Sequence, residues 1–270
     1  TSGVDFSVED KRAIAEALDR LGVDYVEGGW PGANPTDSSF FQSPPTLKRA
    51  TFTAFGMTKR PGRSADNDPG LSEVVNAPVG AVCLVGKTWD YHVDVALGIE
   101  RDENVAMVGE SMAHCIAKGR EALFDAEHFF DGYKANPDYA LACLKSALDA
   151  GARWIVLCDT NGGALPHEIS RIVGEVTEHI PGDRLGIHCH NDTGNAIAGS
   201  LAAVRAGVRQ VQGSLNGLGE RCGNADLAAL IPTLMLKPGF AEKFETGIDD
   251  DGLRHLTATS HLLDELLNRA

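Results

Sequence analysis

The chain has 270 residues, a net charge of −14 and 43% hydrophobic residues, enough for one large domain with a sizeable core. The acidic balance argues against nucleic acid or an anionic membrane as a partner, because there is no basic stripe to neutralise phosphates. No apolar run approaches the roughly 18 residues that span a bilayer, and the six scattered cysteines are typical of reduced thiols, so we expect a cytoplasmic protein without a membrane span or a disulfide framework.

A recurring order of helix, glycine and short apolar run organises the chain. The first helix is expected to begin at Ser7, which can cap it, and to end at Gly22. Asn136 and Pro137 are expected to start another helix. Further helices are predicted at residues 165–180, 195–207 and 253–269. The apolar runs predict seven strands, at residues 23–27, 50–55, 80–85, 121–126, 153–158, 185–190 and 209–214.

Strands that alternate with helices predict a parallel sheet built from βαβ units, and the chain length suits a (β/α)8 TIM barrel. Such a barrel needs eight strands, whereas this chain starts with a loop that leads into a helix. We therefore expect that the first strand is absent from the sequence. A seven-stranded open sheet is the alternative, but it would leave two unpaired edges beside a buried interior.

Two parts of the chain are expected to differ in architecture. The barrel domain is predicted to cover residues 1–240, and a C-terminal helical extension, the start of an accessory region, residues 241–270. Leucines recur at helical spacing between residues 253 and 269. They predict an exposed apolar face that would bind a partner or a further domain.

Polar side chains gather where the expected strands end, which is where (β/α)8 enzymes carry their chemistry. They include His92, Asp125, Glu127 and Thr160. Glu127 could act as an acid or base, or form a salt bridge at the rim. Thr160 could donate to a substrate carboxylate or cap the following helix, and spacing alone favours the cap. Several such ends on one rim favour a site over chance.

His188 and His190 lie two positions apart in an expected strand and so point to the same face. Ile187 and Cys189 suit the side that faces the helices, which turns the histidines towards the barrel axis. Two satisfied structural histidines are the alternative, but a pair at a barrel rim favours a metal site. Two neutral ligands hold a hard divalent ion poorly, so carboxylate, amide or water oxygens are also needed.

Two stretches carry a resemblance to a known family. HCHNDTGNA at residues 188–196 and QGSLNGLGERCGNADL at residues 212–227 resemble the signature of the α-isopropylmalate, homocitrate and citramalate synthase family. Further stretches, among them GKTWDYHVDVALG and FDAEHFFDGYKANP, look most like its citramalate synthase branch. The resemblance covers nearly the whole chain. It implies a metal-dependent (β/α)8 enzyme that condenses acetyl-CoA with a small α-keto acid.

The resemblance also implies a metal site and partners. His188 and His190 match the two metal-ligand histidines of the family, and Asn224 matches the asparagine at or just outside the coordination sphere. The expected cofactor is a divalent metal ion, either Mg, Mn or Zn. The expected partners are acetyl-CoA, the keto acid and a second copy of the chain in a homodimer.

The family's substrate residues map onto the same rim. Glu127 matches the glutamate beside the keto acid and is our candidate catalytic residue. Thr160 matches the threonine that hydrogen-bonds the substrate carboxylate, and His92 is grouped with it as a substrate-binding residue. The family opens with a strand ending in an Arg-Asp-Gly motif, which supplies a metal ligand and a catalytic arginine. This chain begins just after the place where that motif would fall.

The predicted function is a citramalate synthase-like Claisen condensation of acetyl-CoA with pyruvate, a step of branched-chain amino-acid biosynthesis. A 2-isopropylmalate or homocitrate synthase is the alternative within the family, separated by the size of the keto-acid pocket. A lyase of the HMG-CoA lyase or aldolase type on the same barrel would cleave a carbon–carbon bond instead of forming one. An inactive metal-binding fragment is the non-catalytic alternative.

Overall fold

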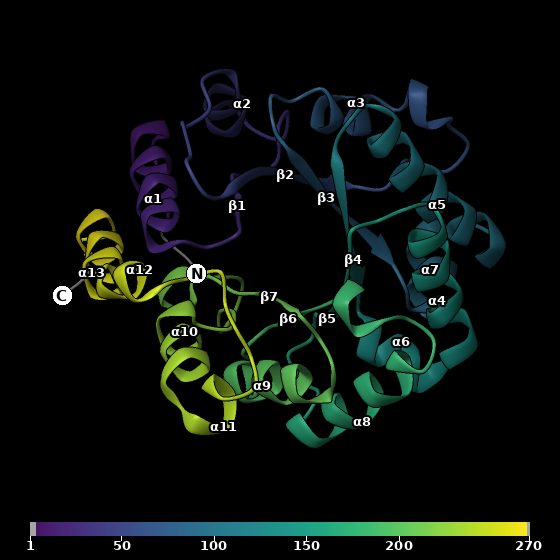
Figure 1. Cartoon of the computed structure of the whole chain (residues 1–270). Helices are drawn as coiled ribbons and strands as arrows, with labels where there is room; N and C mark the ends of the chain where they lie inside the picture. The colour runs from purple at the N-terminus through teal and green to yellow at the C-terminus, as the bar shows by residue number, and fades with distance from the viewer. Residues whose placement is uncertain (1–3, 269–270) are drawn as a thin grey trace.

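The computed structural model describes residues 4–268 and shows a single parallel sheet wrapped by helices (Figure 1). The strands pair in sequence order from β1 to β7, every neighbouring pair being parallel. Their bounds are β1 Tyr25–Glu27, β2 Thr51–Met57, β3 Ala81–Lys87, β4 Glu121–Glu127, β5 Trp154–Asp159, β6 Leu185–Cys189 and β7 Gln210–Gln212. All seven predicted strands are therefore confirmed.

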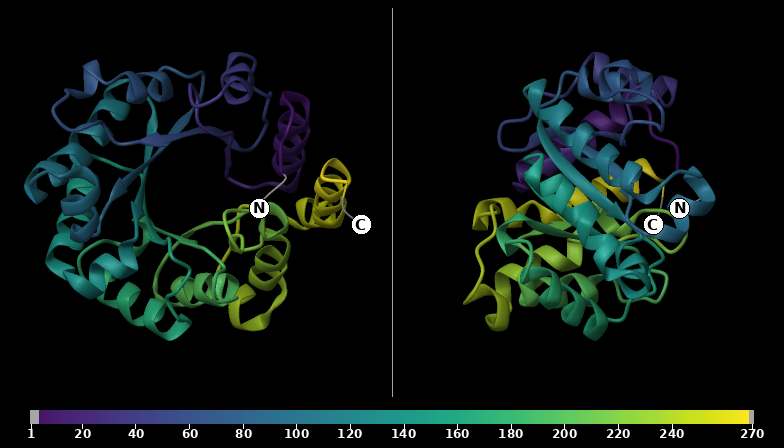
Figure 2. Two further views of the ribbon diagram at one scale, coloured as in Figure 1. Left: turned by 180° about the vertical axis from the view of Figure 1, so that it is seen from behind. Right: turned by 90° about the vertical axis from the view of Figure 1, so that its right-hand side faces the viewer.

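Helices cover the outer side of the sheet in both views of Figure 2. Their bounds are α1 Val8–Leu21, α2 Pro35–Gln42, α3 Pro69–Val75, α4 Asp90–His92, α5 Arg101–Ala117, α6 Phe129–Ala135, α7 Pro137–Asp149, α8 Pro166–Thr177, α9 Ala196–Ala206, α10 Leu227–Leu236, α11 Pro238–Ala241, α12 Asp250–Arg254 and α13 Leu256–Leu266. Within residues 4–268, none of them combines the length and the apolar character that crossing a membrane requires.

The predicted helix boundaries have clear local causes. The side chain of Ser7 accepts a hydrogen bond from the backbone N–H of Asp10, and the chain leaves α1 at Gly22 with a φ of 98°, a left-handed conformation that glycine adopts without strain. The side chain of Asn136 caps α7, and Pro137 occupies its first turn. These features explain why the alternation of helix and strand can be predicted from the sequence.

The sheet is curled, so that side chains from non-neighbouring strands meet across its concave interior. Gln212 on β7 donates to Asp125 on β4, with an Nε2 to Oδ1 distance of 2.9 Å. At the other end of the interior, the indole N–H of Trp154 donates to the hydroxyl of Tyr25 over 3.2 Å. These contacts fit an incomplete (β/α)8 barrel of seven strands among residues 4–268, in which β1 and β7 form the two ends of the sheet and do not pair with each other.

The C-terminal helices differ from the expectation. The predicted helix at residues 253–269 is divided into α12 and α13, and both pack against α1. Leu263 is buried, and the other leucines of the stripe are half-buried. The predicted exposed leucine face is therefore wrong, because α1 covers the apolar side of α13.

Candidate active site

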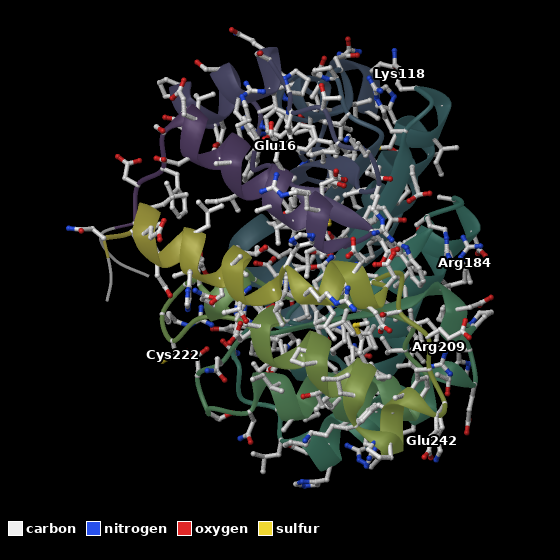
Figure 3. The ribbon with its side chains drawn as sticks, turned by 60° about the vertical axis from the view of Figure 1, so that its left-hand side comes forward. Glu16, Lys118, Arg184, Arg209, Cys222 and Glu242 are labelled. Atoms are coloured by element: carbon white, nitrogen blue, oxygen red, sulfur yellow. The ribbon has the colours of Figure 1, made fainter. Side chains whose placement is uncertain are left out.

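The carboxyl ends of the parallel strands bring the predicted residues to one end of the curled sheet. Figure 3 separates the two ends: Cys222 follows β7 on one side of the molecule, whereas Arg184 and Arg209, which precede β6 and β7, lie on the other. Ile187 and Cys189 are buried in the core between the sheet and the helices. His188 therefore faces the concave interior, as predicted from the alternation of the strand.

The two histidines lie side by side, with ring centroids 5.1 Å apart. The Nδ1 atom of His188 lies 2.8 Å from Oε1 of Gln212, which only accepts, so Nδ1 carries the proton. The Nδ1 atom of His190 lies 2.6 Å from the carbonyl oxygen of Thr160. With Nδ1 as the donor, Nε2 of each ring carries a lone pair, and that of His188 accepts from Nδ2 of Asn224 over 3.1 Å. Burial lowers the pKa of His190, which favours the neutral imidazole that binds a metal.

Arg221 forms hydrogen bonds beside the two histidines. Its guanidinium forms a two-point ion pair with Asp192, through Nε to Oδ1 at 2.8 Å and Nη2 to Oδ2 at 2.9 Å. The same Nη2 donates to the carbonyl of Thr160 over 2.7 Å. Both hydrogens of Nη2 are then used, so its 2.9 Å approach to His190 donates no further proton to the ring. The carbonyl thus receives the Nδ1 proton of His190.

Asn224 completes the group. It forms an isolated antiparallel bridge with His190, and its Nδ2 lies 3.1 Å from Nε2 of His188. Its Oδ1 is buried without a hydrogen-bond partner. Two imidazole lone pairs beside an unused amide oxygen fit a divalent ion. Residues 4–268 contain no group of three or more His, Cys, Asp or Glu side chains placed for a metal, so further oxygen ligands are needed.

Thr160 does not cap the following helix. Its hydroxyl oxygen accepts the backbone N–H of His128 over 2.8 Å, and α8 begins only at Pro166. The helix-capping interpretation, which spacing favoured, is therefore wrong. Because a threonine hydroxyl can accept and donate at once, its proton stays available for a ligand in the interior.

Glu127 forms a salt bridge with Lys87, its register partner on β3. The salt bridge at the rim, one of the two roles considered for Glu127, is therefore present. It does not exclude a role as an acid or base. His92 lies against Trp89 and His128, with ring centroids 4.7 Å and 4.5 Å away. Burial, with His128 and Lys87 as further causes, lowers the pKa of His92. His92 therefore belongs to an aromatic rim beside the Glu127–Lys87 pair.

A layer of polar groups lies in the interior beneath the histidines, and sequence reasoning gave it no role. Burial raises the pKa of Asp125 despite hydrogen bonds from Cys83 and Gln212. Desolvation, followed by the charge of Asp125, raises the pKa of Glu27 to about 8. Glu27 is nevertheless exposed to solvent, so its carboxyl lies in a crowded but solvent-accessible part of the interior. The sequence places Asp125 among the polar strand ends but does not predict that it and Glu27 lie in one layer.

This raised pKa predicts a pH effect. A carboxyl whose folded pKa lies near 8 rather than at 4.5 contributes stability in full below about 4.5, and this contribution is lost as pH rises through about 8. Glu27→Gln removes the titration, so its stability relative to the original chain should increase between pH 5 and pH 8.5. Urea unfolding at both pH values measures this, with Glu245→Gln at an exposed position as the control. The prediction is wrong if the difference in free energy of unfolding between Glu27→Gln and the original chain does not grow with pH.

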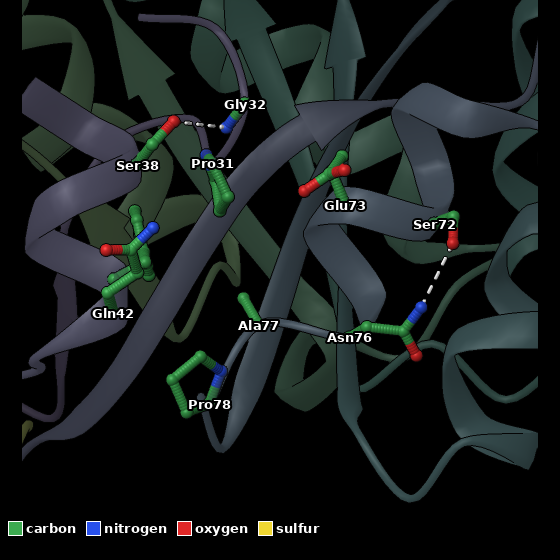
Figure 4. Close-up of a pocket in the computed structure, with 10 residues that line it drawn as sticks. Pro31, Gly32, Ser38, Gln42, Ser72, Glu73, Asn76, Ala77 and Pro78 are labelled. Atoms are coloured by element: carbon green, nitrogen blue, oxygen red, sulfur yellow. Dashed lines mark hydrogen bonds between the residues drawn. The ribbon is translucent and has the colours of Figure 1, made fainter. Parts of the chain in front are cut away.

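Two open hollows on the outer surface are separate from this group. One of about 310 Å³ lies between α2 and α3 and is lined by residues that include Ser38, Glu73 and Asn76 (Figure 4). The other, of about 390 Å³, is lined by Arg205, Gly239, Lys243 and Phe244. Neither lining includes the paired histidines.

The comparisons with known proteins agree with this geometry. The HMGL-like family matches residues 1–259. The chain belongs to the HMGL-like family. The match includes every residue of the candidate site, from Glu27 to Asn224. The family assignment therefore rests on the whole curled sheet rather than on one motif.

Within this family, the chain is similar to several (R)-citramalate synthases. It is 48% identical to that of Aquifex aeolicus over 98% of this chain and 50% of the relative, and 49% identical to that of Geobacter sulfurreducens over 98% and 49%. The 2-isopropylmalate synthase 1 of Caldanaerobacter subterraneus is 33% identical over 87% and 58%. The chain thus spans about half the length of the citramalate synthases it matches.

Solved structures support the fold. The HMG-CoA lyase of Bacillus subtilis superposes with a TM-score of 0.81 at 17% identity, over 99% of this chain and 89% of that one. An HMG-CoA lyase from Brucella melitensis gives a TM-score of 0.78 at 18% identity, over 98% and 93%. At such low identity these likenesses show the HMGL-like fold alone.

Proposed function

We propose that the protein to which this chain belongs is a citramalate synthase that condenses acetyl-CoA with pyruvate. The observation that carries the proposal is the identity of 45–49% to five (R)-citramalate synthases, against 31–33% to three 2-isopropylmalate synthases. The convergence of His188, His190 and Asn224 at the carboxyl ends of the strands supports it, because this is where a (β/α)8 enzyme carries its site.

The residues that would hold the divalent ion are His188 and His190, with Asn224 at or just outside the coordination sphere. When bound, Mg²⁺, Mn²⁺ or Zn²⁺ acts as a Lewis acid that polarises a ketone. The chain orients both histidines for such an ion: oxygen acceptors face both Nδ1 atoms, so Nε2 is the atom of each ring that would bind it.

The keto acid is proposed to lie between the histidines and the rim. The free hydroxyl proton of Thr160 would donate to its carboxylate. Glu127 would orient the substrates and handle protons, with Lys87 keeping its carboxylate in place. His92, packed on Trp89 and His128, would form the wall of the pocket.

The reaction forms one carbon–carbon bond. A methyl proton leaves acetyl-CoA, the resulting enolate carbon attacks the ketone carbon of pyruvate, and the ketone oxygen gains a proton. Water then cleaves the thioester, which releases citramalate and CoA. Exclusion of bulk water from the interior during the first step would protect the enolate.

The expected homodimer rests on the family resemblance alone and stays a prediction.

The test is release of the CoA thiol from acetyl-CoA with pyruvate or 2-oxoisovalerate, each with Mg²⁺, Mn²⁺ or Zn²⁺. It is run on the 270-residue chain and on the same chain preceded by a strand ending in Arg-Asp-Gly. We expect pyruvate-dependent release from the extended chain. Release with 2-oxoisovalerate alone would instead assign a 2-isopropylmalate synthase, and no release from either chain would contradict the proposal.

A further inference from the structure

A chain of hydrogen bonds runs from the buried Asp125 through Gln212 to His188. Gln212 donates from Nε2 to Oδ1 of Asp125 over 2.9 Å, and its Oε1 lies 2.8 Å from Nδ1 of His188. His188 and Gln212 are register partners on β6 and β7, whereas Asp125 reaches them from β4 across the interior. Asp125 is only 6% exposed, so this contact is made inside the protein.

The two ends of the Gln212 amide are not equivalent in this chain. An amide alone can present either its oxygen or its N–H to an imidazole, and each choice selects a different tautomer of the ring. A carboxylate oxygen accepts hydrogen bonds, so Asp125 draws the amide nitrogen towards itself. The amide oxygen is then turned to His188, whose Nδ1 must donate.

We propose that Asp125 and Gln212 are positioning residues that select the Nδ1–H tautomer of His188 and so keep its Nε2 unprotonated, as binding of a divalent ion requires. The metal part of this inference rests on the proposed function, whereas the tautomer part does not. Neither residue is proposed to contact the ion or the substrates. Outer partners of metal-binding histidines typically change metal affinity by about 10- to 100-fold when they are removed.

His190 offers a control within the same molecule. Its Nδ1 bonds the backbone carbonyl of Thr160, which can only accept. No substitution of Asp125 or Gln212 changes that carbonyl. The tautomer of His190 should therefore stay the same in every variant, and a change at His188 alone would report the hydrogen-bond chain rather than a general loss of structure.

The decisive experiment exchanges the two functional groups. Asp125→Asn keeps the shape but lets the Gln212 amide turn round, so His188 should show a mixture of tautomers. Gln212→Glu places two carboxylates side by side and breaks the donation to Asp125. The double variant Asp125→Asn/Gln212→Glu restores one donor and one acceptor in the opposite order: the introduced amide donates to the introduced carboxylate, which accepts from Nδ1.

Two readouts are compared for the whole chain. Histidine ¹⁵N NMR at pH 8.5 without metal gives the tautomers, and titration with Mn²⁺ alone gives the affinity. We expect Nδ1–H at both histidines in the original chain, a mixture at His188 in Asp125→Asn with about 10- to 100-fold weaker Mn²⁺ binding, and recovery of both in the double variant.

Several results would overturn the inference. An Nε2–H tautomer at His188 of the unmodified chain would do so even if no variant folded. So would an unchanged His188 tautomer in a folded Asp125→Asn chain, or a double variant no better than the poorer single one. If the chain shows the tautomer pattern but neither it nor the extended chain releases thiol, the proposed function is contradicted and the tautomer selection still stands.

Discussion

Replacing His188 with alanine should weaken Mn²⁺ binding by more than about 100-fold, which is beyond the range expected for an outer partner. His188 presents its Nε2 towards Asn224 and shares the site with His190, whose ring centroid is 5.1 Å away. Without it, one imidazole and an amide remain, and these hold a hard divalent ion poorly. Titration calorimetry with Mn²⁺ measures the loss.

The matched control is His179→Ala, which removes an exposed histidine just beyond α8. It should leave Mn²⁺ affinity within about threefold of the original value, since surface substitutions away from a site have small effects. Circular dichroism checks that both variants fold. If His188→Ala bound Mn²⁺ as tightly as His179→Ala, the assignment of His188 as a metal ligand would be wrong.

The sequence predicts the barrel well because its strands and helices are locally determined. The run Trp154–Asp159 is buried at every position, as expected for a strand between two layers. The Ser7 and Asn136 caps and the glycine at residue 22 set helix ends within a few residues of their own positions. Alternation likewise predicts which face His188 and His190 share.

The sequence predicts the site less completely because its remaining contacts are distant along the chain. Gln212 meets Asp125 across 87 residues, and Arg221 reaches the Thr160 carbonyl across 61. No local pattern encodes such a pairing, since it depends on how far the sheet curls. The same holds for Thr160, whose hydroxyl bonds His128, 32 residues earlier, rather than the next helix.

The largest effect on stability is expected from Phe124→Ala on β4. Phe124 is fully buried at 0% exposure in the core between the sheet and the helices. A side chain at Gly86 on β3 would come within 2.9 Å of its ring, so the ring and the glycine are matched in shape. Removing the ring loses its transfer free energy and leaves a cavity, which together cost about 3–5 kcal/mol.

Urea unfolding should therefore show a free energy of unfolding lower by about 3–5 kcal/mol in Phe124→Ala, with Val95→Ala as the control because Val95 is 61% exposed. The loss of packing around Phe124 would also affect the candidate active site. Side chains alternate along β4, so Phe124 anchors the outer face of the strand whose inner face carries Asp125 and Glu127. A cost below about 1 kcal/mol would mean that the helices close over the cavity and that β4 is held mainly by its two neighbouring strands.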